Sequence, residues 1–216
     1  MVNEQIIETR RLPAPAVAPQ ALAWHSGALW LGSRDLRHIY KMDKEKWTLL
    51  EAWEAPGIPW AAVSLGDALR FTIGEDPDDD RYIRRFVPGK GFTDRIACPE
   101  LTGSYLSYDG RRIFLSQWYK ERILELDEAG NVLRQIDIGA EICGHTFVDG
   151  LIYVLRGKEK PAEDWRIARL DPAQERPEVH DIAHVPFACR SLAFDGQNFW
   201  TNHRSANETV SFVLPA

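Results

Sequence analysis

The sequence predicts an all-β protein folded as a five-bladed β-propeller. Three observations lead to this prediction: one pattern recurs along the whole chain, its spacing is even, and the two chain ends hold complementary parts of a repeat. In the pattern, an apolar strand is followed by a turn and a second strand with an aromatic residue. It occurs at 22–30, 62–71, 106–114, 147–153 and 192–200. Few windows show apolar residues at helical spacing, so helix-rich folds are disfavoured.

The spacing of this pattern gives the number of blades. Superposing the turns places five residues in one register, with steps of 40, 44, 40 and 46: Gln20, Trp60, Ser104, Gly144 and Arg190. Repeats of about 40–45 residues are as long as one four-stranded propeller blade. We therefore expect a single domain whose blades span 20–58, 59–102, 103–142, 143–188 and 189–216, the last together with 4–12.

Blade three shows the expected strands best. They lie at 104–108, 112–117, 122–127 and 132–138. Asp109 and Gly110 separate the first two strands. This pair predicts a two-residue hairpin turn, because Asp-Gly readily adopts the positive φ that both turn positions need.

The ring is expected to close through the N-terminal segment. The fifth repeat ends one strand short after 211–214, and 4–12 form a strand with no blade of their own. Pairing these two segments completes the blade and leaves no incomplete sheet in the ring. An open β-sandwich or a barrel is the alternative, although neither requires even spacing between like turns.

The repeats resemble those of the streptogramin-lyase-like and glutamine-cyclotransferase-like bacterial propellers. An apolar-Ala-aromatic-Asp-Gly strand is followed by a strand such as 28–33 (Ala-Leu-Trp-Leu-Gly-Ser) and then by one such as 39–43 (Ile-Tyr-Lys-Met-Asp). The Trp-Asp dipeptide of WD40 blades and the double glycine of kelch blades are missing from the sequence. The resemblance covers most of the chain and concerns the scaffold, so it implies the fold and not the chemistry.

Composition and charge limit the function. The 216 residues carry a formal net charge of −6 with both signs scattered, so neither nucleic acid nor an anionic membrane surface is expected as a partner. The N-terminal residues lack the apolar stretch of a secretory signal, and no apolar run reaches membrane-spanning length. Three widely separated cysteines do not resemble a disulfide framework. We expect a cytoplasmic protein.

The functional face of such a fold surrounds one mouth of the central channel. Residues before the first strand of each blade and after its second strand meet there. The candidate substrate-binding residues at these positions are Arg34, Trp60, Tyr105, Trp118, Arg156, Arg190 and His203. Guanidinium groups bind carboxylate or phosphate bidentately, and aromatic walls suit a small-molecule pocket. The alternative is that these arginines pair with carboxylates of the blades.

Proton transfer at this mouth is assigned to His145 and Glu75. His145 opens the inner strand of blade four, and an imidazole titrates near neutral pH. Glu75 lies closest to the mouth in the acidic loop 75–80, which lacks the glycine and the spacing of a calcium loop. The resemblance to streptogramin lyases suggests a histidine and glutamate pair, although that family's motif cannot be matched residue by residue. The structural alternatives are a histidine bonded to a neighbouring blade and a solvated loop.

Cys143 and Cys189 form a second candidate site. Each lies one residue before the shared register position of its blade, so adjacent blades bring the two thiols into one neighbourhood. A thiolate binds thiophilic metals and electrophiles, and His145 could complete a site for zinc or another divalent metal ion. The alternative is packing, because free cysteine is among the most buried residue types.

Three functional hypotheses follow. The leading one is a small-molecule-processing enzyme, of lyase or hydrolase type, that performs acid–base chemistry on a compact polar or anionic substrate at the channel mouth. The second is a thiolate site at Cys143 and Cys189 for a metal ion, an organometal or an electrophile. The third is a non-catalytic propeller that displays its loops to a protein partner. No Gly-x-Ser-x-Gly elbow, phosphate loop, dinucleotide fingerprint or His-Glu-x-x-His motif is present.

Overall fold

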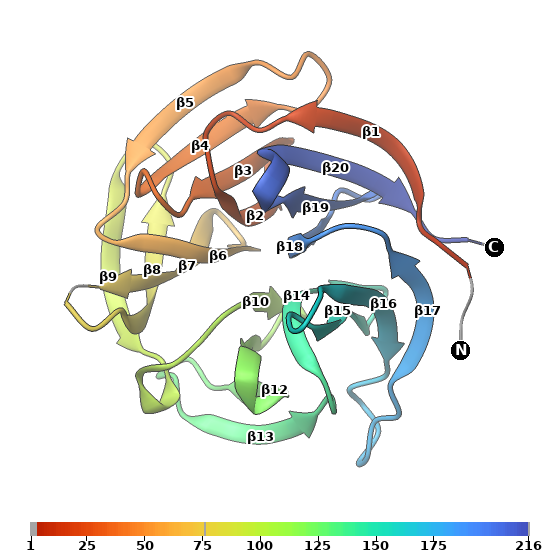
Figure 1. The fold of residues 1–216 in the computed structure, drawn as a ribbon. Coiled ribbons are helices and arrows are strands. Elements are labelled where there is room, and N and C mark those ends of the chain that lie inside the picture. The colour runs from red at the N-terminus through yellow and green to blue at the C-terminus, as the bar shows by residue number, and fades with distance from the viewer. Residues whose placement is uncertain (1–3, 76, 216) are drawn as a thin grey trace.

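Five four-stranded antiparallel sheets surround one central axis in the computed structural model, which describes residues 4–75 and 77–215 (Figure 1). The predicted five-bladed propeller is therefore confirmed. Helical structure in the described residues is limited to three short 3-10 turns, at Pro99–Leu101, Trp118–Lys120 and Arg204–Ala206. None of the described segments is a helix of sufficient length and apolar character to cross a membrane.

The first three sheets each use four consecutive strands. The first contains β2 (Pro19–His25), β3 (Ala28–Ser33), β4 (His38–Asp43) and β5 (Leu49–Glu54). The second contains β6 (Ile58–Leu65), β7 (Ala68–Glu75), β8 (Asp80–Val87) and β9 (Gly91–Ala97). The third contains β10 (Leu106–Tyr108), β11 (Ile113–Gln117), β12 (Arg122–Leu126) and β13 (Val132–Asp137).

The fourth sheet also uses four consecutive strands, whereas the fifth combines both ends of the chain. The fourth contains β14 (Glu141–Val148), β15 (Leu151–Lys158), β16 (Asp164–Leu170) and β17 (His180–Val185). The fifth contains β18 (Cys189–Phe194), β19 (Phe199–His203), β20 (Glu208–Val213) and β1 (Ile7–Pro13). β1 pairs antiparallel with β20, so the N-terminal strand closes the ring as predicted (Figure 1).

The N-terminal segment also contacts the fourth blade. The amide of Ile6 donates to the carbonyl of His184 over 3.1 Å, and the amide of His184 donates to the carbonyl of Glu4 over 2.8 Å. Residues 4–6 therefore run beside β17, and the following residues run beside β20. One continuous segment holds the two blades together.

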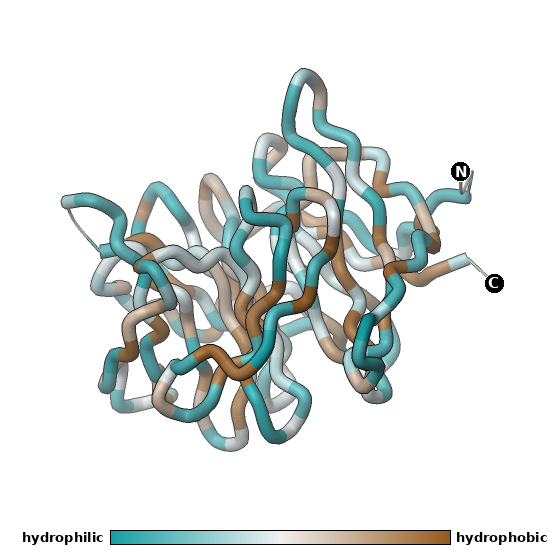
Figure 2. Tube along the Cα trace, turned by 90° about the horizontal axis from the view of Figure 1, so that it is seen from below, coloured by the Kyte–Doolittle hydropathy of each residue, from teal (hydrophilic) through white to brown (hydrophobic). Residues whose placement is uncertain are grey.

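Side chains packed between neighbouring blades form the core. Trp30, Trp165 and Trp200 are its largest members, and each is at most 1% exposed. Hydrophilic turns lie at both faces of the disc, while apolar residues fill the strands between them (Figure 2). The inner strands approach closely: a Cβ on Gly144 would lie 2.6 Å from the backbone carbonyl carbon of Ser191 in the next blade. A glycine at this register position lets blades four and five meet.

One predicted turn differs in the structure. Residues 109–112 form a four-residue loop rather than a two-residue turn. The Asp109 carboxylate accepts the backbone N–H groups of Arg111 and Arg112 over 2.7 and 2.6 Å, and this side-chain cap stabilises the longer loop. The two-residue form occurs at 149–150, where φ is 50° and 78°. An Asp-Gly pair marks the hairpin in both cases, but the capping contact sets the loop length.

Candidate functional site

A cavity of about 330 Å³ opens where the inner strands begin and the second strands end. All five blades contribute to its lining. Its four aromatic side chains are Trp60, Tyr105, Trp118 and Tyr119, and its four arginines are Arg34, Arg81, Arg190 and Arg204. Ser104 and Glu159 complete the lining. The mixture of flat apolar walls and a few charged groups is typical of small-molecule sites.

The repeat register explains which residues reach this cavity. Five of the seven predicted binding residues line it: Arg34, Trp60, Tyr105, Trp118 and Arg190. Each opens an inner strand, lies near its start or directly follows a second strand, and such positions converge around the propeller axis. The structure gives the placement of these residues, and their role in binding stays a prediction.

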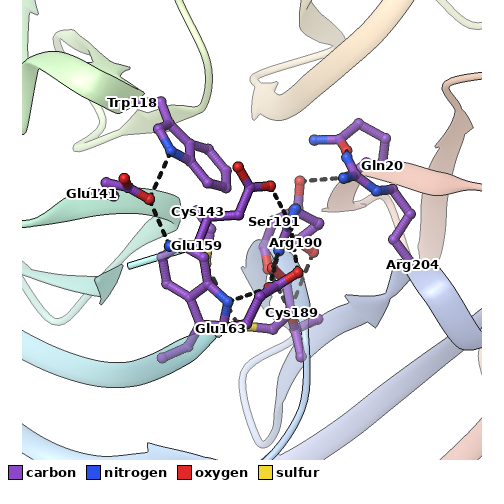
Figure 3. A network of polar contacts seen from close by, with 12 residues as sticks. Gln20, Trp118, Glu141, Cys143, Glu159, Glu163, Cys189, Arg190, Ser191 and Arg204 are labelled. Atoms are coloured by element: carbon purple, nitrogen blue, oxygen red, sulfur yellow. Dashed lines mark hydrogen bonds and ion pairs between the residues drawn. The ribbon is translucent and has the colours of Figure 1, made fainter. Parts of the chain in front are cut away.

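Two glutamates hold Arg190, and one of them, Glu159, also lines the cavity. Its side chain is 2% exposed, and its two terminal nitrogens contact both carboxylate oxygens of Glu163 over 2.8 and 3.1 Å. Glu159 adds a contact of 3.1 Å to the same guanidinium. Burial opposes the charge, but the hydrogen bonds to Glu163 raise the pKa of Arg190 above its usual range. Figure 3 shows the guanidinium within this carboxylate network, so its charge is neutralised internally.

Arg81 forms part of one cavity wall. Its guanidinium carbon lies 4.0 Å from the ring centroid of Trp60. The Asp79 carboxylate accepts from the indole N–H of Trp60 over 3.0 Å and from Arg81 over 2.6 Å. Asp79 therefore fixes the stacked pair and neutralises Arg81.

Arg204 differs from the other arginines of the cavity. Arg34 pairs with Asp35 over 2.8 Å, whereas no carboxylate within the described residues lies at ion-pair distance from Arg204. Its Nη1 donates to the Oε1 atom of Gln20 over 2.7 Å (Figure 3). Burial, together with the positive charges of Arg190 and Arg34, lowers the pKa of Arg204. Arg204 is thus a partly buried cation that has a neutral partner.

Solved structures share this architecture. Glutaminyl cyclase of Myxococcus xanthus is 12% identical with a TM-score of 0.73, and the match covers 98% of each chain. Virginiamycin B lyase of Staphylococcus aureus is 16% identical with a TM-score of 0.55, over 94% of this chain and 69% of the lyase. A PQQ-bound aldose sugar dehydrogenase of Streptomyces coelicolor is 11% identical with a TM-score of 0.59, over 98% of each chain.

These likenesses establish the fold alone. The first two confirm the scaffold resemblance that the repeats indicate. Sequence comparison adds nothing to them, because no family model and no curated protein matches the chain. The chemistry must therefore be argued from the side chains at the cavity.

His145 lies inside the blade interface and does not line the cavity. It is 1% exposed, and its Nε2 lies 3.1 Å from the carbonyl oxygen of Tyr105. Since a carbonyl only accepts, Nε2 carries the proton and Nδ1 accepts from the Ser107 hydroxyl over 2.7 Å. Burial lowers the pKa of His145 to about 4. The structural alternative, a histidine bonded to a neighbouring blade, matches this placement.

Glu75 is directed to its own sheet. Its carboxylate contacts Arg84 over 2.8 Å and Arg95 over 2.9 Å. Although burial opposes ionisation, these two cations keep the pKa of Glu75 below its usual range. The structure does not bring Glu75 and His145 together, and neither lines the cavity. The predicted proton-transfer pair therefore has no support from geometry.

The two register-related cysteines touch. The Sγ atoms of Cys143 and Cys189 lie 3.5 Å apart, and both side chains are buried. Burial raises the pKa of Cys143 well above its usual value, so the thiol form is favoured. His145 bonds to Ser107 and Tyr105 instead of joining them. The described part of the chain contains no group of three or more His, Cys, Asp or Glu side chains arranged to hold a metal ion.

The last two predicted binding residues lie elsewhere. Arg156 contacts Asp181 over 2.8 Å and borders a separate cavity on the fourth blade. The ring of His203 packs against Phe187, with 5.0 Å between centroids, and its Nδ1 lies 3.5 Å from a Glu208 carboxylate oxygen. Arg156 thus matches the alternative in which the arginines pair with carboxylates of the blades, and His203 lies outside the cavity lining.

Sequence reasoning missed the acidic groups at the site. Glu159 and Glu163 follow β15, and Asp79 precedes β8, so all three belong to loops between second and third strands. Such loops differ in length between blades and fall outside the register. The sequence did contain a signal for this network. Glu159 and Glu163 come just after the end of a second strand, and Arg190 holds the register position of the next blade.

Proposed function

We propose that the chain binds a compact monoanionic carboxylate in the cavity at the channel mouth and processes it by acid–base chemistry. The observation that carries the proposal is Arg204, a partly buried guanidinium that lines the cavity and contacts a neutral amide. A partly buried charge without a carboxylate in direct contact is costly, and an anionic ligand would supply this contact.

The pairing of the arginines favours a single carboxylate on the ligand. Three of the four arginines contact carboxylates of the protein: Arg34 contacts Asp35, Arg81 contacts Asp79, and Arg190 contacts both Glu159 and Glu163. The four charges are therefore balanced in number, but two carboxylates contact Arg190 and none in the described part of the chain contacts Arg204 directly. One carboxylate on the ligand would give Arg204 this contact, whereas a phosphate dianion would bring more negative charge than one unpaired arginine can match.

The walls favour a ligand with a flat apolar body. Trp60 and Trp118 face the cavity, and Tyr105 lies 6.1 Å from Trp118 between ring centroids. Aromatic rings bury large apolar area with little loss of conformational entropy. The cavity volume lies at the small end of the ~300–1,000 Å³ range of ligand pockets, which limits the size of the ligand.

Glu159 is the group placed to move a proton. It is the carboxylate among the cavity-lining residues, and one of its oxygens contacts Arg190 while the other lies 3.5 Å from the Tyr119 hydroxyl. A carboxylate in reach of a ligand can act as a general base or acid. Deuterium exchange at C3 of pyruvate and phenylpyruvate, the carbon next to the ketone, followed by NMR in D2O, tests this role. Exchange above the buffer rate should depend on Glu159 and be lost in Glu159→Gln; an unchanged rate in this variant contradicts the assignment.

Binding is tested with matched charged and neutral probes. Benzoate, phenylacetate and pyruvate should quench or shift tryptophan fluorescence, because Trp60 and Trp118 line the cavity. Benzamide, the neutral counterpart of benzoate, should bind more weakly. Arg204→Gln should weaken carboxylate binding by roughly 10- to 100-fold, while Arg111→Gln, at an exposed position far from the cavity, should have no effect. Equal binding of benzoate and benzamide, or of benzoate to the wild type and Arg204→Gln, rules out the proposal.

The second candidate function, a thiolate site at Cys143 and Cys189 for a metal ion or an electrophile, has weaker support than carboxylate binding. The 3.5 Å contact brings two sulfurs together, as a soft-metal or electrophile site needs. Reactivity and metal binding require the thiolate, however, and burial raises the pKa of Cys143. Elemental analysis of the purified protein and thiol titration in the folded state test this candidate directly. A bound soft metal, or rapid labelling of both thiols, would favour it.

A further inference from the structure

Gln20 lies behind the cavity lining and contacts three of the lining residues, Trp60, Tyr105 and Arg204. The residue is the second of β2 and is 1% exposed. Its Nε2 donates to the carbonyl of Trp60 over 3.2 Å and contacts the Tyr105 hydroxyl over 3.0 Å. Its Oε1 accepts from Arg204 over 2.7 Å. A single buried amide thus contacts three blades.

The partners of this amide determine its orientation. A backbone carbonyl can only accept and a guanidinium can only donate, so Nε2 must face Trp60 and Oε1 must face Arg204. The reversed amide would place two acceptors together on one side and two donors together on the other. The Tyr105 oxygen consequently accepts from Gln20.

This orientation leaves the Tyr105 proton available. Since its oxygen is an acceptor toward Gln20, the hydroxyl can donate to another group, and none of the hydrogen bonds among the described residues uses that proton. Burial raises the pKa of Tyr105 far above its usual value, so the hydroxyl keeps its proton. Tyr105 and Arg204 both line the cavity, and both side chains carry hydrogen-bond donors.

We propose that Gln20 is a positioning residue that orients Tyr105 and Arg204 as a two-donor site for one carboxylate. This inference rests on the proposed function and adds the group that determines its specificity. A carboxylate offers two oxygens to two donors, whereas a neutral amide would leave the Arg204 charge uncompensated. Gln20 therefore selects the ionised form of the ligand without providing a charge itself.

The Gln20→Glu substitution gives the sharpest test, because it changes one group and keeps the shape. A carboxylate at position 20 would pair with Arg204 and accept a hydrogen bond from the Tyr105 hydroxyl. Both donors would then be occupied within the protein. We expect benzoate binding to weaken by at least about 10-fold. Benzamide binding should change little, so the preference for benzoate over benzamide should disappear. A loss of structure alone would lower both affinities together.

Two further variants separate the possible outcomes. Tyr105→Phe keeps the ring and removes the proton, and it should reduce the preference for benzoate while leaving the melting temperature close to that of the wild type. Gln20→Met removes the amide and should weaken benzoate binding without creating a new ion pair. These variants keep the test valid if Gln20→Glu folds poorly.

The results distinguish this inference from the proposed function. If Arg204→Gln loses benzoate binding while Gln20→Glu and Tyr105→Phe bind it as the wild type does, the positioning role is wrong and the binding site stands. If the wild type binds neither benzoate, phenylacetate nor pyruvate, the proposed function fails. If Arg204→Gln, Gln20→Glu and Tyr105→Phe all lose the preference for benzoate over benzamide, both the proposed function and the positioning role of Gln20 are supported.

Discussion

The Ser107 hydroxyl donates to Nδ1 of His145 over 2.7 Å within the interface of blades three and four. The other ring nitrogen donates to the Tyr105 carbonyl, so a neutral imidazole satisfies both partners. Protonation would place a second proton on Nδ1, opposite a hydroxyl that now donates there. The hydroxyl would have to turn and accept, and the imidazolium charge would be buried, so the neutral form is favoured and stability depends on pH.

We predict that His145 destabilises the fold at mildly acidic pH. Its pKa is about 4 in the folded protein and about 6.5 in an unfolded chain. Between these values the unfolded chain binds a proton that the folded protein does not, so stability falls as the pH falls, by up to about 3 kcal/mol. Urea unfolding at pH 7 and pH 4.5 measures the change. The variant His145→Asn serves as the control, because carboxylates of the protein also titrate in this range and contribute equally in both proteins. If the free energy of unfolding depends on pH in the same way in the wild type and in His145→Asn, the prediction is refuted.

We predict that removing residues 1–12 destabilises the whole propeller. The side chains of β1 are largely exposed, so the loss comes mainly from the backbone ladder with β20, the contacts of residues 4–6 with β17 and the buried side chain of Ile6. The loss of several kcal/mol should lower the melting temperature by about 10 °C or more. A synthetic peptide of residues 4–13 added in excess should restore part of the loss. An unchanged melting temperature would contradict closure by this strand.

We predict that Gly144→Ala is strongly destabilising. The new methyl group would meet the backbone of Ser191 at 2.6 Å and of Leu192 at 2.7 Å, and backbone atoms cannot move aside cheaply. The expected cost is about 3 kcal/mol. Gly196→Ala serves as the comparison, since its Cβ would meet nothing within 4 Å and only its φ of 94° is unfavourable, at about 1 kcal/mol. Denaturant unfolding of both variants gives the order, and a smaller loss for Gly144→Ala would overturn it.

We predict that Arg190 and Glu163 are strongly coupled. Glu163→Gln should cost about 2 kcal/mol, because it leaves a buried guanidinium with only one carboxylate nearby. The double variant Glu163→Gln with Arg190→Met should be more stable than Glu163→Gln alone, since the buried charge is then absent. Additive losses in this double-mutant cycle would show that the pair is not coupled.

The repeat made the scaffold predictable from sequence. Equal spacing placed Cys143 and Cys189 at one level in adjacent blades, and the structure brings their sulfurs into contact. The missing strand of the last blade and the unassigned N-terminal strand gave the ring closure. Both conclusions depend on backbone periodicity, which apolar residues and turns report directly.

The partners of the charged residues were not predictable in the same way. Arg190 was placed at the mouth by its register, but Glu163 reaches it from a loop between β15 and β16. Glu75 was expected closest to the mouth, yet arginines on the two outer strands of its own sheet, β8 and β9, hold it. Side-chain direction and loop path decide such contacts, and neither follows the repeat.

The strand that completes the fifth blade has a consequence for how the protein is made. Among the strands of the ring, β1 leaves the ribosome first and its partner β20 leaves last. The ring cannot lock during synthesis, so the early strand stays unpaired until the final blade emerges. A circular permutant that joins the two ends and opens the chain between blades two and three would synthesise both strands in succession, and should fold in a different order to the same ring.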